Sequence, residues 1–166
     1  MTTRRGFIAA CAGMAAAWMA RPAAAETAAQ PLVVYDDELK NGWQSWSWAK
    51  VELAVPAGGA KPIKVQGDPW SALALHHDAF PTTGYNKLTF MINGGAQGGQ
   101  DLMVKIMVDG KPVDSNYVIQ PKAKTWARVE VALKDIAAEG KTIDGICWQG
   151  QASAYSPYYI TRIQFE

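Results

Sequence analysis

Short runs in which apolar and polar residues alternate recur from Leu32 to the C-terminus, and turn-forming residues separate them. The clearest runs are 88–92 and 102–108, and the second ends in Asp109-Gly110, a strong two-residue hairpin signal. Residues 117–119 are expected to pair with that strand. Period-two alternation places successive side chains on opposite faces of a strand. About nine or ten such strands, with at most one short helical turn near residues 133–139, predict an all-β fold, either an antiparallel sandwich or a barrel.

The first 25 residues have the pattern of an export signal. Arg4-Arg5 and Phe7 form a twin-arginine n-region, an apolar run follows, and Ala23-Ala24-Ala25 fits a cleavage site. The Sec route is the alternative, and Cys11 gives a weaker match to a lipoprotein box. We expect a twin-arginine type signal peptide at 1–25, a short leader at 26–30, one domain at 31–166, and a periplasmic or secreted protein. Apart from the signal, no segment is long and apolar enough for a membrane span.

Cleavage after residue 25 would leave 141 residues, enough for one substantial core. Three of the 16 basic residues and no acidic residue lie in the signal, so the mature charge is 13 basic against 15 acidic residues, or −2. With no basic patch, nucleic acid is not an expected partner, nor is an anionic membrane. Cys147 would be the one remaining cysteine, which predicts a buried thiol and no intrachain disulfide. A monomer is expected.

Three indoles lie within the six residues Trp43-Gln44-Ser45-Trp46-Ser47-Trp48. Trp46 and Trp48 share one parity, so in a strand they project from the same face. The opposite parity continues in the expected strand 50–55, whose Val51, Leu53 and Val55 are assigned to the core. Two tryptophans on a water-facing surface are energetically unfavourable unless another group covers them. A sugar ring, another protein or an overlying loop would each provide one, and a β-bulge after Trp48 would exchange the faces.

A second group follows at His76-His77-Asp78. His76 and Asp78 share a face with Trp70, and the alanines between them would leave room for a shallow groove floor, whereas His77 lies nearer the core. A structural His–Asp hydrogen bond, a ligand contact and a metal site are all open for this pair. Two ligands are few for a metal.

Two later tryptophans are less clearly placed. Trp148 shares the parity of the core residue Ile146, and both a core position and a position in the binding site are open for it. Gln149 is a candidate for hydrogen bonds to sugar hydroxyls. Trp126 shares a parity with Arg128 and is expected to cap one end of the core. The candidate contact face comprises Trp46, Trp48, Trp70, His76, Asp78, Trp148 and Gln149.

Several of these segments resemble carbohydrate-binding-module-like β-sandwiches attached to secreted bacterial cellulases. The resemblance rests on residues 34–37 followed by 42–48, on 75–80, on 85–95 and on 125–133, and it extends over most of residues 33–165. It implies a galactose-binding-like jelly roll that binds a polysaccharide or oligosaccharide without cleaving it. Such modules often hold a structural calcium with an acid in the last strand. Thr161-Arg162 stands there instead, so no cofactor is expected, although Asp36 or Asp37 could still contribute to a calcium site.

The sequence supports a catalytic function less well than a binding function. A glycosidase needs two opposed carboxylates, and Asp36 or Asp37 with Asp78 is the one pairing considered for a small glycan-active hydrolase. No serine-nucleophile or zinc-protease motif is present. A periplasmic protein–protein interaction module, whose indoles cover a partner protein, is the other alternative.

Overall fold

The computed structural model describes residues 29–166, so the expected signal peptide and the first part of the leader lie outside the described residues. Within this range the chain forms strands and one 3₁₀ turn, η1 (Leu133–Ile136). The strands are β1 (Leu32–Tyr35), β2 (Gln44–Ser45), β3 (Lys50–Glu52), β4 (Ile63–Gly67), β5 (Ala72–Pro81), β6 (Lys87–Asn93), β7 (Leu102–Val108), β8 (Lys111–Pro112), β9 (Val118–Ile119), β10 (Trp126–Ala132), β11 (Thr142–Gly150) and β12 (Tyr155–Phe165).

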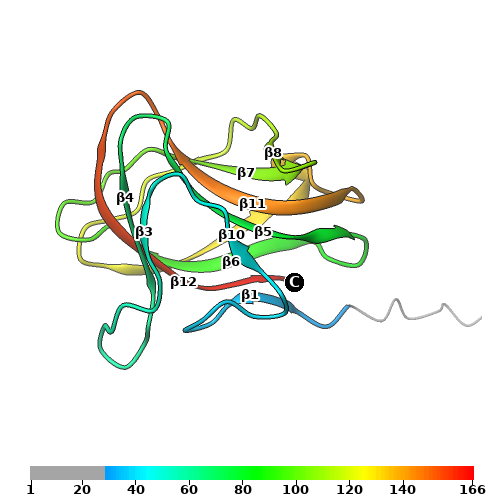
Figure 1. Ribbon diagram of the computed structural model, residues 1–166, viewed down its shortest axis with the longest axis horizontal. Coiled ribbons are helices and arrows are strands. Elements are labelled where there is room, and N and C mark those ends of the chain that lie inside the picture. Colours follow the sequence, from blue (N-terminus) through cyan, green and yellow to red (C-terminus); the bar gives the residue numbers. More distant parts are fainter. Residues whose placement is uncertain (1–28) are drawn as a thin grey trace, which may run out of the picture.

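The strands form two antiparallel sheets that pack face to face (Figure 1). The first sheet has the order β10-β6-β12-β4-β3, with β1 also paired to β12. The second has the order β2-β5-β11-β7-β8, with β9 also paired to β7. This is the antiparallel sandwich, one of the two all-β architectures that the alternating runs predict, and it is built as a single domain.

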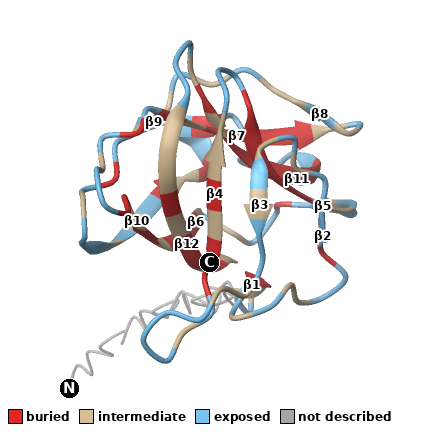
Figure 2. Cartoon of the chain, turned by 60° about the vertical axis from the view of Figure 1, so that its left-hand side comes forward, coloured by how far each residue is buried: buried red, intermediate tan, exposed pale blue. Residues whose placement is uncertain are grey.

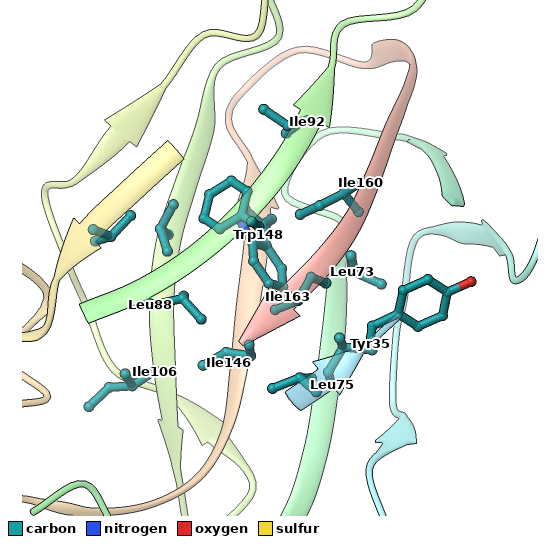
Figure 3. Packing of buried hydrophobic residues seen from close by; sticks show 14 of the residues in the cluster. Tyr35, Leu73, Leu75, Leu88, Ile92, Ile106, Ile146, Trp148, Ile160 and Ile163 are labelled. Carbon is teal, nitrogen blue, oxygen red and sulfur yellow. The ribbon is translucent and has the colours of Figure 1, made fainter. Parts of the chain in front are cut away.

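One continuous core lies between the sheets. Trp148 of β11 occupies its centre among Leu88, Ile146 and Ile163 (Figure 3), and its ring meets that of Phe90 edge-on at a centroid distance of 5.2 Å. Buried and partly exposed residues alternate along β4, as Figure 2 shows, because only one face of that strand points inward. The sequence pattern thus determines which face of each strand is buried.

The Asp109-Gly110 hairpin is confirmed. Both residues have a positive φ, of 52° and 69°, which suits the right-handed twist of a two-residue hairpin. β7 pairs with β8 through this turn and with β9 on the same edge, so residues 118–119 do return to the expected strand. Cys147 is fully buried in β11, and burial raises the pKa of its thiol to about 12.

Two expectations about the core are wrong. Leu53 is 44% exposed rather than buried, because β3 ends at Glu52 and the positive φ of Ala54, 56°, turns the chain away from the sheet. Trp126 does not cap the core. It is 40% exposed on the outer face of the first sheet, since its parity in β10 is opposite to that of the buried Val131.

Trp148 is also corrected as a candidate contact residue. Its side chain has no exposed surface, so it cannot touch a ligand that binds at the surface of this fold. The parity shared with Ile146 was the valid signal, and the polar neighbour Gln149 lies on the other face of the same strand.

We expect Trp148→Ala to lower the free energy of unfolding by roughly 3–5 kcal/mol, because the truncation leaves a large cavity at the centre of the core. Chemical denaturation followed by circular dichroism would measure the change. Trp126→Ala, which removes an exposed indole, is the matched control and should cost much less. Near-native stability of the Trp148 variant would contradict the core assignment.

Candidate functional site

The candidate site lies on the outer face of the second sheet, along the edge formed by β2 and β5. Gln44 and Ser45 pair with His76 and Leu75. The chain continues beside β5 after β2 ends, since the backbone N–H groups of Trp46 and Trp48 donate to the carbonyls of Ala74 and Ala72 at 2.9 and 3.1 Å. The two indoles therefore share the outer face of the sheet.

Ser47 lies between these indoles and fastens the segment to the sheet. Its hydroxyl accepts the N–H of Ala74 at 3.0 Å and also donates to the carbonyl of the same residue at 3.2 Å. A side chain thus replaces part of the backbone ladder while the tryptophans keep their common orientation. The expected shared face of Trp46 and Trp48 is confirmed, and both remain about half exposed, at 49% and 46%.

Trp46 stacks flat on His76. The ring centroids are 3.5 Å apart and the planes differ by 2°. The indole N–H donates to the side-chain oxygen of Gln44 at 3.3 Å, and a Cβ at Gly110 would lie 3.4 Å from the Cζ3 atom of the indole. Trp46 is therefore held by His76 of β5, by Gln44 of β2 and by the Asp109-Gly110 turn. This support fixes the orientation of the ring while leaving half of it exposed.

Trp48 and Trp70 are joined through one carbonyl oxygen. The indole N–H of Trp48 donates to the backbone carbonyl of Trp70 at 2.9 Å, and the Gln149 amide donates to the same oxygen at 2.9 Å. The amide nitrogen of Gln149 thus positions the Trp70 turn. We call Trp46, Trp48 and Trp70, with His76 beneath Trp46, the tryptophan platform.

Trp70 has an unusual backbone conformation. It follows Asp68-Pro69 in a turn that the Ser71 N–H closes on the carbonyl of Asp68 at 3.2 Å. Its φ is +64°, a region that bulky L-residues rarely adopt and that favours glycine. The side chain is nevertheless an indole, and it is 52% exposed. A strained turn that carries a large exposed ring is typical of a functional position.

The alanines behind the platform do not form the expected open groove floor. Ala72 and Ala74 have no exposed surface and pack with Met107 and Cys147 in a small cluster on this face. Lys105 of β7 pairs with Cys147 of β11 in the sheet. Its ammonium forms an ion pair with the Asp114 carboxylate at 3.0 Å. The exposed part of the site is thus the platform and its rim.

The two histidines divide as expected. His77 faces inward, where its ring lies 5.2 Å from Trp43, and both ring nitrogens meet backbone carbonyls, of Asp78 and Asn41, at 2.7 and 2.8 Å. The structural hydrogen bond of this motif therefore uses the Asp78 backbone and not its carboxylate. Asp78 is exposed, two residues beyond His76 on β5.

A shallow depression of about 360 Å³ adjoins Trp48, with Lys50, Gln66, Asp68 and Tyr155 among its lining residues. The Tyr155 hydroxyl donates to the carbonyl of Ser71 at 3.2 Å and accepts from the Ser71 hydroxyl at 3.1 Å. Burial raises the pKa of Tyr155, so the phenol remains a neutral hydrogen-bonding group. The platform thus continues into a polar hollow beside Trp48.

Four supporting residues were missed by reasoning from the sequence: Gln44, Ser47, Gly110 and Asp144. Asp144 accepts the N–H of Gly110 at 2.7 Å and so holds the turn against which Trp46 lies. It comes at a register shift in β11 that no local pattern reveals. The alternation of Gln44 with Trp46 was a usable signal, because side chains two residues apart on a strand share a face.

The carboxylates considered for catalysis or calcium are separated. Asp36 lines a hollow with Arg128 and Arg162 on the first sheet, whereas Asp78 belongs to the second. An oxygen of Asp37 accepts the Lys61 N–H at 2.7 Å. Among residues 29–166 no three His, Cys, Asp or Glu side chains gather closely enough to hold a metal ion. Within the same range no helix has the length and apolar character needed to cross a bilayer.

Two packed antiparallel sheets with this strand arrangement define a β-sandwich fold. Family 29 carbohydrate-binding modules share the fold. One solved mutant of such a module matches with a TM-score of 0.63 at 13% identity, covering 83% of this chain and 92% of that chain. Another, complexed with cellulohexaose, gives 0.62 at 13% identity over 82% and 89%. A third, complexed with mannohexaose, gives 0.63 at 12% identity over 82% and 90%.

One sequence relative is an endoglucanase of Dictyostelium discoideum, 29% identical over 147 residues. The match covers 81% of this chain and 21% of the endoglucanase, so the chain corresponds to about a fifth of that protein. No family model matches the chain.

Substitutions at Trp70 should reveal the strained turn. Because the native φ is positive, we expect Trp70→Gly to be more stable than Trp70→Ala by roughly 1 kcal/mol, although both lose the indole. Urea denaturation of both variants would measure the difference. At an ordinary extended position glycine is the less stable of the two, so the opposite order would contradict a left-handed residue here.

Calcium is expected to change stability little, since Asp37 already accepts a backbone N–H and Arg162 occupies the last strand. A bound ion would stabilise by about 2.7 kcal/mol at a hundredfold excess over its dissociation constant. Thermal melts in EDTA and in millimolar calcium should therefore coincide. A clear rise of the midpoint with calcium would contradict this expectation.

Proposed function

We propose that this protein is a non-catalytic module that binds polysaccharide by stacking sugar rings on the tryptophan platform. The observation that carries the proposal is the group of three half-exposed indoles at one sheet edge, two of which, Trp46 and Trp48, are held by specific side-chain contacts. Soluble proteins rarely keep so large an apolar surface uncovered without a binding role.

The chemistry of a pyranose ring fits this surface. Its C–H face is apolar and packs on a flat aromatic ring, while its hydroxyl groups at the edge remain available for hydrogen bonds. Asp78 is exposed two residues after His76 on the same strand, and Lys50, Gln66 and Asp68 line the depression beside Trp48. These groups supply both acceptors and donors for hydroxyls at the edge of a stacked sugar.

The platform is preorganised, which favours binding. Trp46 is fixed on His76, and the Trp48 indole is tied to the Trp70 carbonyl, so little side-chain freedom remains to be lost when a ligand arrives. The comparisons support the proposal, since the fold is shared with modules solved in complex with cellulohexaose and mannohexaose, and the sequence relative is an endoglucanase.

The cellular setting is part of the same proposal. Arg4-Arg5 and the apolar run that follows would direct export of the folded protein, which would then act as a monomer in the periplasm or outside the cell. Cys147, with a buried thiol, suits an oxidising compartment because it offers no accessible group for disulfide exchange.

The double variant Trp46→Ala/Trp48→Ala tests the proposal. At about 1 kcal/mol for each stacked ring, we expect the affinity for cellohexaose or mannohexaose to fall about 30-fold. Isothermal titration calorimetry would measure the affinity, and a thermal melt would show whether the variant keeps a cooperative transition.

Trp126→Ala is the matched control, because it removes a similarly exposed indole from the opposite sheet and should leave this affinity unchanged. Failure of the double variant to fold would mean that the two indoles are structural. Absence of oligosaccharide binding in the unmodified protein would favour a protein partner for the platform.

A further inference from the structure

A second aromatic surface lies on the outer face of the first sheet. Trp126 of β10 and Tyr159 of β12 both pair with Asn93 of β6, so the three side chains form one row across the sheet. Neighbouring strands are about 4.8 Å apart, which places the two aromatic residues about 10 Å apart on the same face. Trp126 is 40% exposed, and Tyr159 is partly exposed.

A hollow of about 270 Å³ lies at this row, and we call it the Trp126 hollow. Asn93, Lys124, Trp126 and Tyr159 line it, together with the small residues Ala57, Gly95 and Ala96. Gly95 keeps the wall close to the tyrosine, since even a Cβ there would be 3.7 Å from the Tyr159 ring. The hollow therefore has two aromatic residues and a wall of small side chains.

The charge of the hollow is positive. Lys124 is its one charged lining residue, and neither Lys124 nor the nearby Lys122 belongs to any ion pair among residues 29–166. Two carboxylates on the same sheet face are already engaged, because Glu52 pairs with Lys64 at 3.0 Å and Glu130 with Lys87 at 2.9 Å. An anionic group would thus find an uncompensated ammonium at this position.

Local structure holds the lysine beside the indole. The backbone N–H of Lys124 donates to the carbonyl of Gly95 at 2.7 Å, and its φ of +53° bends the chain into β10. The Asn93 side chain uses its oxygen to accept the Gly95 N–H at 2.9 Å. Its amide NH₂ has no partner within the described part of the chain, so it provides a free donor next to the aromatic row.

We propose that the Trp126 hollow is a second glycan site, which takes a uronic acid residue of an acidic polysaccharide. The sugar ring packs against Trp126 and Tyr159, and its carboxylate meets the Lys124 ammonium. Stacking needs the apolar face of a pyranose, and the unpaired cation selects for a carboxylate over a neutral hydroxymethyl group. This site lies on the opposite sheet from the tryptophan platform and does not depend on it.

Calorimetry with trigalacturonate at low salt tests the second site on the complete protein. We expect Trp126→Ala to weaken binding about tenfold or more and Lys124→Asn about fivefold or more. Asparagine tolerates the positive φ at position 124, so that variant removes the charge without straining the turn. Because Lys124 is exposed, Lys124→Asn should fold, and it still tests the site if Trp126→Ala does not fold.

Three controls separate this site from the tryptophan platform and from general charge effects. Lys134→Asn removes an equal charge from η1 and should leave trigalacturonate binding unchanged, as should Trp46→Ala/Trp48→Ala. Methyl-esterified trigalacturonate, which has the same rings without the charge, should bind about tenfold more weakly than the acid. Trp126→Ala and Lys124→Asn should both retain cellohexaose binding.

The proposal is overturned if trigalacturonate does not bind in the millimolar range, if the methyl ester binds equally well, or if Lys134→Asn weakens binding as much as Lys124→Asn. Loss of trigalacturonate binding in Trp46→Ala/Trp48→Ala would also overturn it, since the acid would then occupy the platform. Each of these outcomes is compatible with cellohexaose binding by the unmodified protein, so failure here is distinguishable from failure of the proposed function.

Discussion

The hydrogen bonds between residues 44–48 and the edge of β5 place Trp46 and Trp48 on the outer face of the second sheet. Backbone hydrogen bonds from Trp46 and Trp48 to Ala74 and Ala72 extend a two-residue strand by several positions. The Ser47 hydroxyl meets Ala74 in between, so the segment lies on the sheet without completing a regular ladder. The chain then passes to β3 in the other sheet. A short strand that leaves one sheet for the other thus carries two large rings on its outer side.

Backbone carbonyl groups orient the tryptophans of the platform by accepting hydrogen bonds. The carbonyl of Trp70 receives two side-chain donors, from Trp48 and Gln149. The positive φ of Trp70 has an energetic cost that other contacts must offset. The Trp46–His76 stack adds a second fixed point. The rings of Trp46 and Trp48 are thus held by a stack and by hydrogen bonds, and about half of each side chain remains exposed.

Much of the fold could be predicted from the sequence, because alternation records which face of a strand is buried. The runs of β6 and β7 and the Asp109-Gly110 hairpin were assigned correctly on that basis. The same rule placed Trp46 and Trp48 together. It failed after Glu52, where a positive φ at Ala54 ends the alternation, and no residue type there announces such a turn.

The candidate site was predictable only in part, for a related reason. Exposed aromatic residues can be recognised from parity, but their supports come from distant segments: His76 under Trp46, and Gln149 and the Asp144–Gly110 contact from β11. Trp148 shows the limit of composition as a guide, since a polar neighbour suggested a site while the parity with Ile146 indicated the core. Register shifts such as that between Ile143 and Gly145 are set by tertiary packing.

The back-to-back arrangement of the two sheets has a consequence for valency. Stacked sheets lie about 10 Å apart, and the outer surfaces of this sandwich point in opposite directions. A ligand strand on the β2–β5 edge and another beside β10 would be separated by the whole thickness of the domain. One straight polymer could not engage both surfaces, so a second site would add little avidity on a single strand. It would instead make the domain a cross-bridge between two polymers of different charge within one matrix.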